Sequence, residues 1–353
     1  GAMSRLATFR HALGSVTATV MFAFLGSAGA DAATLVVANK AEATASLIDL
    51  ASGEVVATLP TADGPHEVGI SPDGRFALVT NYGRRDAAGR SLTLIDIPAA
   101  RVAKTIDLEG HERPHGIEWI DGRRAAVTVE DSRALAIVDV ESGEVLTTID
   151  TDQEISHMVA LDSGRQRAYV TSIGSGSLTI IDLATGKRLR NIPTGEGAEG
   201  VAVSAANQQI WVTNRAADTV TVLDADSLEI LKQLPAAGFP IRATATPAGQ
   251  VLVTRARTGD LRIFDAARLA TAKTVSFDIE TMDVEERLFG DRFGDSSVPI
   301  GVVVDGSGKR AYVAHANADV ITEIDLASGA VTRTLRAGKE PDGMGYSPLT
   351  VRP

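Results

Sequence analysis

Two short hydrophobic phrases recur along the chain and set its pattern of apolar and polar positions. The first is a pair of apolar residues followed by Asp, with Glu replacing one apolar residue in the last copy. Its copies end at Asp49, Asp96, Asp139, Asp182, Asp224, Asp265 and Asp325. The second phrase precedes the first by about 10–15 residues and reads Val212-Thr213-Asn214 in one of its copies. Self-similarity at this spacing, about 42 residues, predicts one supersecondary unit per copy.

Each copy predicts four short β-strands joined by turns. β-Branched residues fill the apolar segments, and Gly-containing turns such as Ser71-Pro72-Asp73-Gly74 separate them. The strands of the first complete copy are expected at 66–71, 75–81, 91–97 and 101–108. The Asp that ends the first phrase is expected to form the turn between the third and fourth strands, because its side chain accepts hydrogen bonds from nearby backbone N–H groups.

The two ends of the repeat array complete one another. From Thr34 the chain supplies the second, third and fourth strands of a copy, and it finishes with a lone first strand at about Asp342–Ser347. Pairing of these segments would close a ring and remove the free sheet edges that invite aggregation. The expected fold is therefore all-β. It is a seven-bladed β-propeller with four antiparallel strands per blade, formed by residues 34–353 as a single domain.

Several phrases resemble a known family. Tyr169-Val170-Thr171, Trp211-Val212-Thr213-Asn214 and the segment 68–75 are similar to the repeats of the YVTN-repeat β-propeller family, whose periplasmic members include YncE-like proteins. The resemblance covers nearly all of 34–347 and is loosest in the blade at 115–149. It implies the propeller fold and a bacterial periplasmic location. It does not select a function, because the same fold serves binding, scaffolding and enzymatic proteins.

The first 33 residues predict a segment that is not part of the fold. Gly1-Ala2 reads as a tag remnant, and Arg5 and Arg10 precede an apolar run from about 12 to 25. Ala28-Gly29-Ala30 then supplies a small-residue cleavage site, so residues 1–33 are expected to contain a signal peptide. No later segment approaches transmembrane length. The protein is expected to be periplasmic or secreted, with no membrane span after cleavage.

Composition removes several classes of partner and cofactor. The chain has no Cys, which excludes disulfides, covalently attached c-type haem, iron–sulfur clusters and thiolate metal sites. Its formal net charge of −11 argues against a nucleic-acid partner, which would require a basic face.

The repeat register predicts a ring of residues at one mouth of the central channel. In a propeller the first strand of every blade lines the channel, and one residue position at the start of that strand recurs in each blade. We call these seven positions the ring slots. In order around the ring they are Asp342, His66, His115, His157, Glu199, Ile241 and Ile300. Five of the seven are candidate metal ligands, and they form one continuous arc.

This arc predicts a binding site for a divalent transition metal. His66, His115 and His157 with Glu199 and Asp342 offer imidazole and carboxylate ligands that suit Zn, Cu or Fe. Two further histidines are expected on the same face and are candidates for accessory ligands: His111, in the loop that leads to His115, and His315, at the end of the second strand of its blade. Duplication of a polar residue between repeats, in a mouth that binds no metal, would produce the same pattern.

One connection is longer than the others, at roughly 278–298. It is acidic, carries Leu288, Phe289 and Phe293 as buried-looking residues, and joins a fourth strand to the next first strand, so it is expected to overhang the ring. A short helical lid and a loop that docks a protein partner are both consistent with this composition, as is a surface excursion with no role.

Three functions remain open at this point. The first is a periplasmic propeller that stores or delivers the metal held by the arc. The second is a metalloenzyme that uses the same residues on a small substrate at the channel mouth. The third is a metal-free protein-interaction scaffold.

Overall fold

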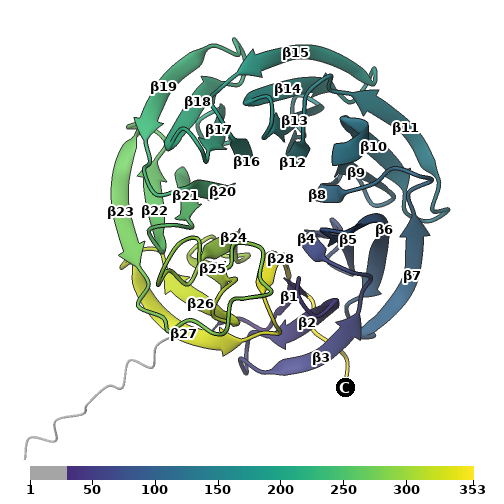
Figure 1. Cartoon of the computed structure of the whole chain (residues 1–353), viewed down its shortest axis with the longest axis vertical. Coiled ribbons are helices and arrows are strands. Elements are labelled where there is room, and N and C mark those ends of the chain that lie inside the picture. Colours follow the sequence, from purple (N-terminus) through teal and green to yellow (C-terminus); the bar gives the residue numbers. More distant parts are fainter. Residues whose placement is uncertain (1–29) are drawn as a thin grey trace, which may run out of the picture.

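The fold is known from a computed structural model that describes residues 30–353. Within this range twenty-eight β-strands form seven four-stranded antiparallel sheets, which stand as blades around a central channel (Figure 1). The only helical element described is a single 3-10 turn, η1 (Glu130–Ser132). No helix among the described residues is long and apolar enough to cross a membrane. The seven-bladed, all-β fold expected from the repeat is confirmed.

The blades follow one another along the chain. The first is β28 (Pro341–Ser347), β1 (Thr34–Asn39), β2 (Thr44–Asp49) and β3 (Val55–Pro60). The second and third are β4 (Pro65–Ile70), β5 (Phe76–Arg84), β6 (Ala87–Asp96), β7 (Arg101–Asp107), and β8 (Pro114–Trp119), β9 (Arg124–Val129), β10 (Ala134–Asp139), β11 (Val145–Asp150). The fourth and fifth are β12 (Ser156–Asp162), β13 (Arg167–Ser172), β14 (Ser177–Asp182), β15 (Lys187–Pro193), and β16 (Ala198–Ser204), β17 (Gln209–Asn214), β18 (Thr219–Asp224), β19 (Ile230–Pro235). The last two are β20 (Pro240–Ala245), β21 (Gln250–Arg255), β22 (Asp260–Asp265), β23 (Ala270–Ser276), and β24 (Pro299–Val304), β25 (Arg310–His315), β26 (Val320–Asp325), β27 (Ala330–Arg336).

Closure of the ring is made by the two ends of the array. β28 pairs antiparallel with β1, with Val36 opposite Gly345 and Thr34 opposite Ser347. The first sheet therefore joins one C-terminal strand to three N-terminal strands, so that each of the seven blades in the described ring has four strands. The signal-peptide prediction for residues 1–33 falls almost entirely outside the described residues.

The repeated Asp residues form the predicted turns. Asp139, Asp182, Asp224 and Asp265 each accept hydrogen bonds from the backbone N–H groups two and three residues further on. These bonds stabilise the ionised side chain, and they are the first cause that lowers the pKa of Asp224 and Asp265. The Asp of the first phrase is therefore a structural residue of the blade.

The core lies between neighbouring blades. Inner and middle strands are buried, as in β1 and β17, whereas outer strands such as β3 and β19 alternate toward solvent. Trp211 is fully buried on β17 and Trp119 is 8% exposed on β8, so both belong to blade packing, as the sequence indicated. This packing makes the inner strands a rigid frame for whatever side chains they direct into the channel.

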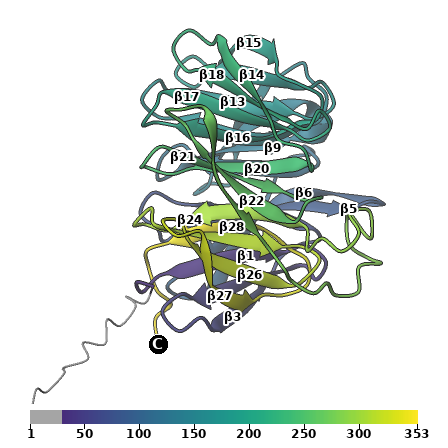
Figure 2. The same ribbon diagram turned by 90° about the vertical axis from the view of Figure 1, so that its left-hand side faces the viewer.

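The long connection before β24 forms turns and irregular backbone, so the short helical lid, one of the alternatives that its sequence allowed, is wrong. It packs on the loops that lead to β26 and β28, through the Arg287–Asp319 ion pair and the Leu288 N–H bond to Glu340. Phe293 is buried, but Leu288 is 52% exposed and does not belong to the core. Together with the β5–β6 hairpin, which extends beyond the strands expected from the sequence, it projects from one side of the disc in Figure 2.

Candidate functional site

Every ring slot is the second residue of an inner strand. The inner strands β4, β8, β12, β16, β20, β24 and β28 begin at the residue before the slot, so the register read from the sequence is correct. The residue preceding each strand has positive φ in all seven blades, including non-glycine residues such as Arg113 and Glu340. This shared backbone bend turns the chain from the loop into the channel wall and gives all slots an equivalent position.

The Thr of the second phrase holds the slots in place. In five blades its hydroxyl donates to the carbonyl oxygen of the slot residue in the next blade, as from Thr80 to His115 and from Thr128 to His157, both at 2.7 Å. In the other two blades the equivalent residues are Ala38 and Ala314, which have no hydroxyl. The repeat motif therefore fixes the backbone on which the site is built.

The three slot histidines meet in the channel. The ring centroids of His115 and His157 lie 3.5 Å apart and stacked, and those of His66 and His115 lie 4.9 Å apart edge to face. Tyr82 flanks the row, with its ring centroid 4.5 Å from that of His66. All three imidazoles are buried. The histidines that the sequence places in adjacent slots are thus in ring-to-ring contact in the structure.

His157 is held by two carboxylates. Its Nδ1 lies 2.5 Å from Glu130 Oε1 and its Nε2 lies 2.9 Å from Glu199 Oε1. Carboxylates only accept hydrogen bonds, so both ring nitrogens donate and the ring is an imidazolium. Burial opposes this charge, but Glu199 and Glu130 outweigh it and raise the pKa of His157. In this state neither nitrogen has a lone pair for a metal.

His66 and His115 are neutral. Burial, followed by the nearby Lys40 ammonium, lowers the pKa of His66 to about 3. Burial and the charge on His157 lower the pKa of His115 well below its usual value. His66 Nδ1 lies 2.7 Å from the Gly64 carbonyl oxygen and donates to it, which leaves a lone pair on Nε2. His115 Nδ1 is buried with no hydrogen-bond partner among the described residues.

Arg242 crosses the channel and occupies the centre of the arc. It extends from β20 to Glu67 on β4, 175 residues away in sequence, with its Nη2 2.9 Å from Glu67 Oε1. The same guanidinium donates to Glu199 and lies 3.4 Å from His115 Nε2. Arg215 adds a second ion pair to Glu199 at 3.0 Å. Burial opposes ionisation of Glu199, but Arg215 and Arg242 lower its pKa.

Asp342 is paired in a similar way. Lys40 Nζ lies 2.6 Å from Asp342 Oδ2, and both side chains are buried. Burial opposes its ionisation, but Lys40 and Arg242 lower the pKa of Asp342. Its other oxygen, Oδ1, has no hydrogen-bond partner among the described residues and lies 4.0 Å from Arg242. Both carboxylates of the predicted ligand set are thus neutralised by side-chain cations of the protein itself.

Across residues 30–353 no group of three or more His, Asp or Glu side chains is arranged to hold a metal ion. The five predicted residues are neighbours, but His157, Glu199 and Asp342 are engaged with other charged groups. The metal site therefore stays a prediction.

The two accessory histidines have other partners. His111 Nδ1 lies 2.7 Å from Ser132 Oγ in the loop before β8. His315 is fully buried, and its two nitrogens lie 2.8 Å from Ser297 Oγ and 2.9 Å from Thr322 Oγ1. Both ring nitrogens of His315 thus have hydrogen-bond partners within its own blade.

Sequence reasoning missed the cations and acids next to the slots, above all Arg242 and Glu67. The position after the slot is Gly in four blades because a Cβ there would come within 2.0–2.8 Å of the slot carbonyl oxygen of the next blade. These are Gly116, Gly200, Gly301 and Gly343. The three exceptions, Glu67, Met158 and Arg242, all line the channel cavity. A break in this glycine pattern is the signal that could have identified them.

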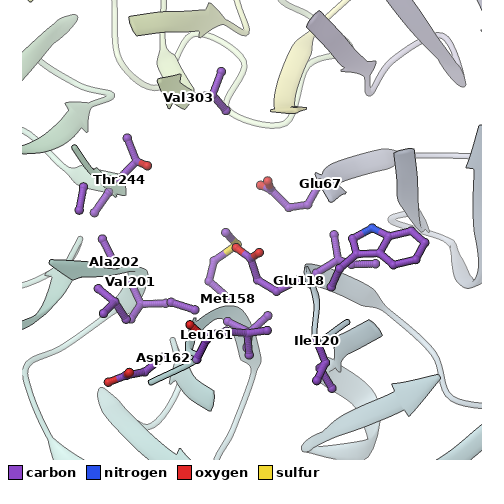
Figure 3. Close-up of a pocket in the computed structure, with 18 of the residues that line it drawn as sticks. Glu67, Glu118, Ile120, Met158, Leu161, Asp162, Val201, Ala202, Thr244 and Val303 are labelled. Atoms are coloured by element: carbon purple, nitrogen blue, oxygen red, sulfur yellow. The ribbon is translucent and has the colours of Figure 1, made fainter. Parts of the chain in front are cut away.

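Beyond Arg242 the channel contains a cavity of about 850 Å³. Its lining begins at Glu67, Met158 and Arg242 and extends to Asp121 and Ser163, in the turns that follow β8 and β12. The cavity thus runs from the histidine layer toward the opposite mouth. Most of the lining residues are apolar residues of the inner strands, several of which Figure 3 shows around a common open space, but polar groups supply more than half of the surface that the lining exposes.

Two carboxyl groups lie at the inner end of this cavity. Figure 3 shows Glu67 and Glu118 both pointing into the open space. Burial raises the pKa of Glu67 to about 7, with Arg242 opposing the shift. Burial and the charge of Glu67 likewise raise the pKa of Glu118 to about 7. Glu118 is enclosed by the channel walls, yet its side chain is exposed to solvent within the channel.

Comparison with known proteins agrees with the fold. Residues 15–124 match the family model described as YNCE-like beta-propeller. This part of the chain is thus similar to YncE-like propellers, and residues 30–353 form a seven-bladed propeller. Residues 122–256 match a second propeller family, described as the cytochrome D1 heme domain. The recognition of a YVTN-repeat, YncE-like propeller from the sequence is confirmed.

Solved structures share the architecture. One is a functionally unknown protein from Desulfotomaculum acetoxidans DSM 771, with a TM-score of 0.73 over 89% of this chain and 98% of that chain. The sequence identity is 12%, so this likeness concerns the fold alone. No curated protein matches the chain.

Proposed function

We propose that this YncE-like propeller is a binding protein that holds a small ligand in the central channel. The observation that supports it is the cavity of about 850 Å³, enclosed by the inner strands and closed toward the histidines by Arg242. A cavity of this volume is typical of small-molecule sites, which are largely apolar and carry a few placed polar groups. At the inner end of this cavity the polar groups are the carboxyls of Glu67 and Glu118, beside Arg242.

Filling the cavity tests this function. Thr244 lines the channel on β20, and Trp at this position would occupy the ligand space without entering the blade core. We expect the wild type to bind the apolar fluorophore N-phenyl-1-naphthylamine at one molecule per chain, and Thr244→Trp to lose this binding. Thr58→Trp, on the exposed outer strand β3, is the matched control and is expected to bind as the wild type does. Equal fluorescence titrations for both variants, or no binding by the wild type, would overturn the proposal.

A second candidate is storage or delivery of a transition metal at the slot arc. It is favoured by the unpartnered atoms His115 Nδ1 and Asp342 Oδ1, together with the free lone pair of His66 Nε2. Two imidazoles and one carboxylate suit divalent Zn, Cu or Fe. Lys40 and Arg242 would compete with the metal for Asp342, because each carries a positive charge near this carboxylate.

Removing the competing cation tests the metal candidate. Lys40→Met is expected to tighten binding of Zn²⁺ in calorimetric titrations at pH 7.5, and His66→Ala and His115→Ala are expected to abolish it. Exposed Lys187→Met is the control for loss of a positive charge, since it leaves the arc intact. Metal below one equivalent in every variant after reconstitution would exclude this candidate.

We also propose that the protein is exported to the periplasm. The support is the signal-peptide pattern of the first 33 residues and the match to YncE-like propellers. Fractionation of cells that express the chain from its Met3 is expected to recover it, shortened at the N-terminus, with periplasmic markers. Full-length protein in the cytoplasmic fraction would contradict export.

A further inference from the structure

Glu118 is an acid without a partner in the channel. It lies on β8, enclosed by the channel walls, and no hydrogen bond or ion pair links its carboxyl group to any described residue. Solvent in the channel hydrates this carboxylate, and a ligand that fills the cavity displaces that water and must supply a cation or a hydrogen-bond donor in its place. The ligand of the cavity is the natural source of that group.

Glu67 presents a second acceptor to the same space. Arg242 donates from both Nε and Nη2 to Glu67 Oε1, at 3.1 and 2.9 Å. No hydrogen bond from a described residue reaches the other oxygen, Oε2. Glu67 can therefore accept a bond from a ligand while its ion pair with Arg242 remains intact.

The cations in the cavity lining are already engaged. Arg242 is bound by Glu67 and Glu199, and Arg124 is paired with Asp121 at 2.9 Å. The lining contains four acids, Glu67, Glu118, Asp121 and Asp162, against these two arginines, so two negative charges are in excess when all are ionised. The remaining walls are mainly apolar. The cavity therefore favours a positively charged ligand with an apolar body.

The small number of oxygens selects an organic cation. Hard metal ions such as Ca²⁺ take six to eight oxygen ligands, whereas this end of the cavity offers two carboxyl groups among apolar walls. An ammonium group needs only two or three acceptors. We infer that the channel ligand is an organic amine, whose apolar body fills the cavity and whose ammonium group binds between Glu118 and Glu67. This inference rests on the proposed binding function of the cavity.

The pH dependence of binding follows from the two acids. Burial raises the pKa of both Glu67 and Glu118 to about 7, so part of each population is protonated at neutral pH. The other charged groups of the lining are Asp121, Asp162, Arg124 and Arg242. The pKa of Asp121 is lowered and that of Arg242 is raised, so these two groups stay charged over this range. Amine affinity is expected to increase as the pH rises from 6 to 8, as both carboxyls ionise. A neutral ligand of the same shape would lack this increase.

Three indole ligands with different head groups test whether the cavity prefers an amine. Tryptamine, indole-3-ethanol and indole-3-propionate share an apolar body and end in ammonium, hydroxyl and carboxylate. At pH 8 we expect calorimetry to give tryptamine an affinity at least about tenfold above the alcohol, because hydrogen bonds to charged groups exceed neutral ones, with the carboxylate weakest. Glu118→Gln is expected to remove this preference and leave the affinity for the alcohol unchanged. Exposed Glu229→Gln is the matched control and should retain it.

The outcomes separate the inference from the function on which it rests. If Thr244→Trp abolishes binding of tryptamine and alcohol alike while Glu118→Gln leaves their ratio unchanged, the cavity binds ligands but the amine inference is wrong. If Thr244→Trp binds both as the wild type does, the binding function of the cavity is itself wrong.

Discussion

The two ends of the central channel solve the problem of buried charge differently. At the histidine end, Arg242, Lys40 and His157 each meet carboxylates of the protein, so the charged groups largely satisfy one another. In the cavity beyond, Glu118 has no partner among the described residues. Groups that satisfy one another rigidify a fold, whereas an unsatisfied group in a cavity is available to a ligand. The sequence drew attention to the first region, and the structure draws it to the second.

The largest expected effect on stability comes from removing the Arg242 guanidinium at the histidine end of the channel. Arg242→Met would leave Glu67 and Glu199 buried without their shared partner, and breaking a buried pair on one side costs about 3–5 kcal/mol of unfolding free energy. Urea denaturation measures the loss. Arg268→Met, at an exposed i,i+3 pair with Asp265, should change stability by less than about 0.5 kcal/mol. An Arg242→Met protein as stable as the wild type would mean that this network does not hold the channel together.

A smaller effect is expected from the hydroxyls that position the slots. Thr128→Val leaves the buried His157 carbonyl oxygen without its donor and the buried Gly116 N–H without its acceptor, at a cost of about 1–3 kcal/mol. Thr58→Val, on an exposed outer strand, should change the unfolding free energy little. Equal denaturation midpoints for the two variants would show that the Thr of the repeat contributes only its β-strand propensity and not this hydrogen bond.

The smallest effect concerns the unpartnered acid. The pKa of Glu118 is about 7 in the folded protein against 4.5 as the ordinary value, so the folded state binds the proton more tightly. The contribution of Glu118 to the free energy of unfolding is therefore fully present below pH 4.5 and is lost as the pH rises through 7. Because solvent in the channel screens this group, the loss is about 1 kcal/mol for Glu118. Glu118→Gln should flatten this part of the pH profile of the denaturation midpoint, and an unchanged slope would contradict the account.

The fold could be predicted from the sequence because its determinants are local and repeated. The apolar–apolar–Asp phrase fixes strand three and the turn after it, and the slot register follows from the repeat spacing. That His66, His115 and His157 lie side by side could therefore be predicted, since equivalent positions in adjacent blades must be neighbours.

The chemistry at that mouth could not be predicted in the same way. Arg242 reaches Glu67 across the ring, and neither the repeat nor the slot pattern says how far a long side chain extends. Lys40 comes from the loop after β1, outside the slots. Glu118 carries no motif at all, and its importance arises from the cavity around it, which exists only once seven inner strands surround one space.

The position of a bound ligand tests the central claim most directly. Crystals of the protein can be soaked with 5-bromotryptamine and measured at the bromine absorption edge. The anomalous signal then locates the bromine atom directly. The account predicts an anomalous peak inside the cavity between β8 and β20, with the ammonium group within hydrogen-bond distance of Glu118. A peak beside His66 and His115 at the other end of the channel, or none in a protein that binds the compound in solution, would contradict it.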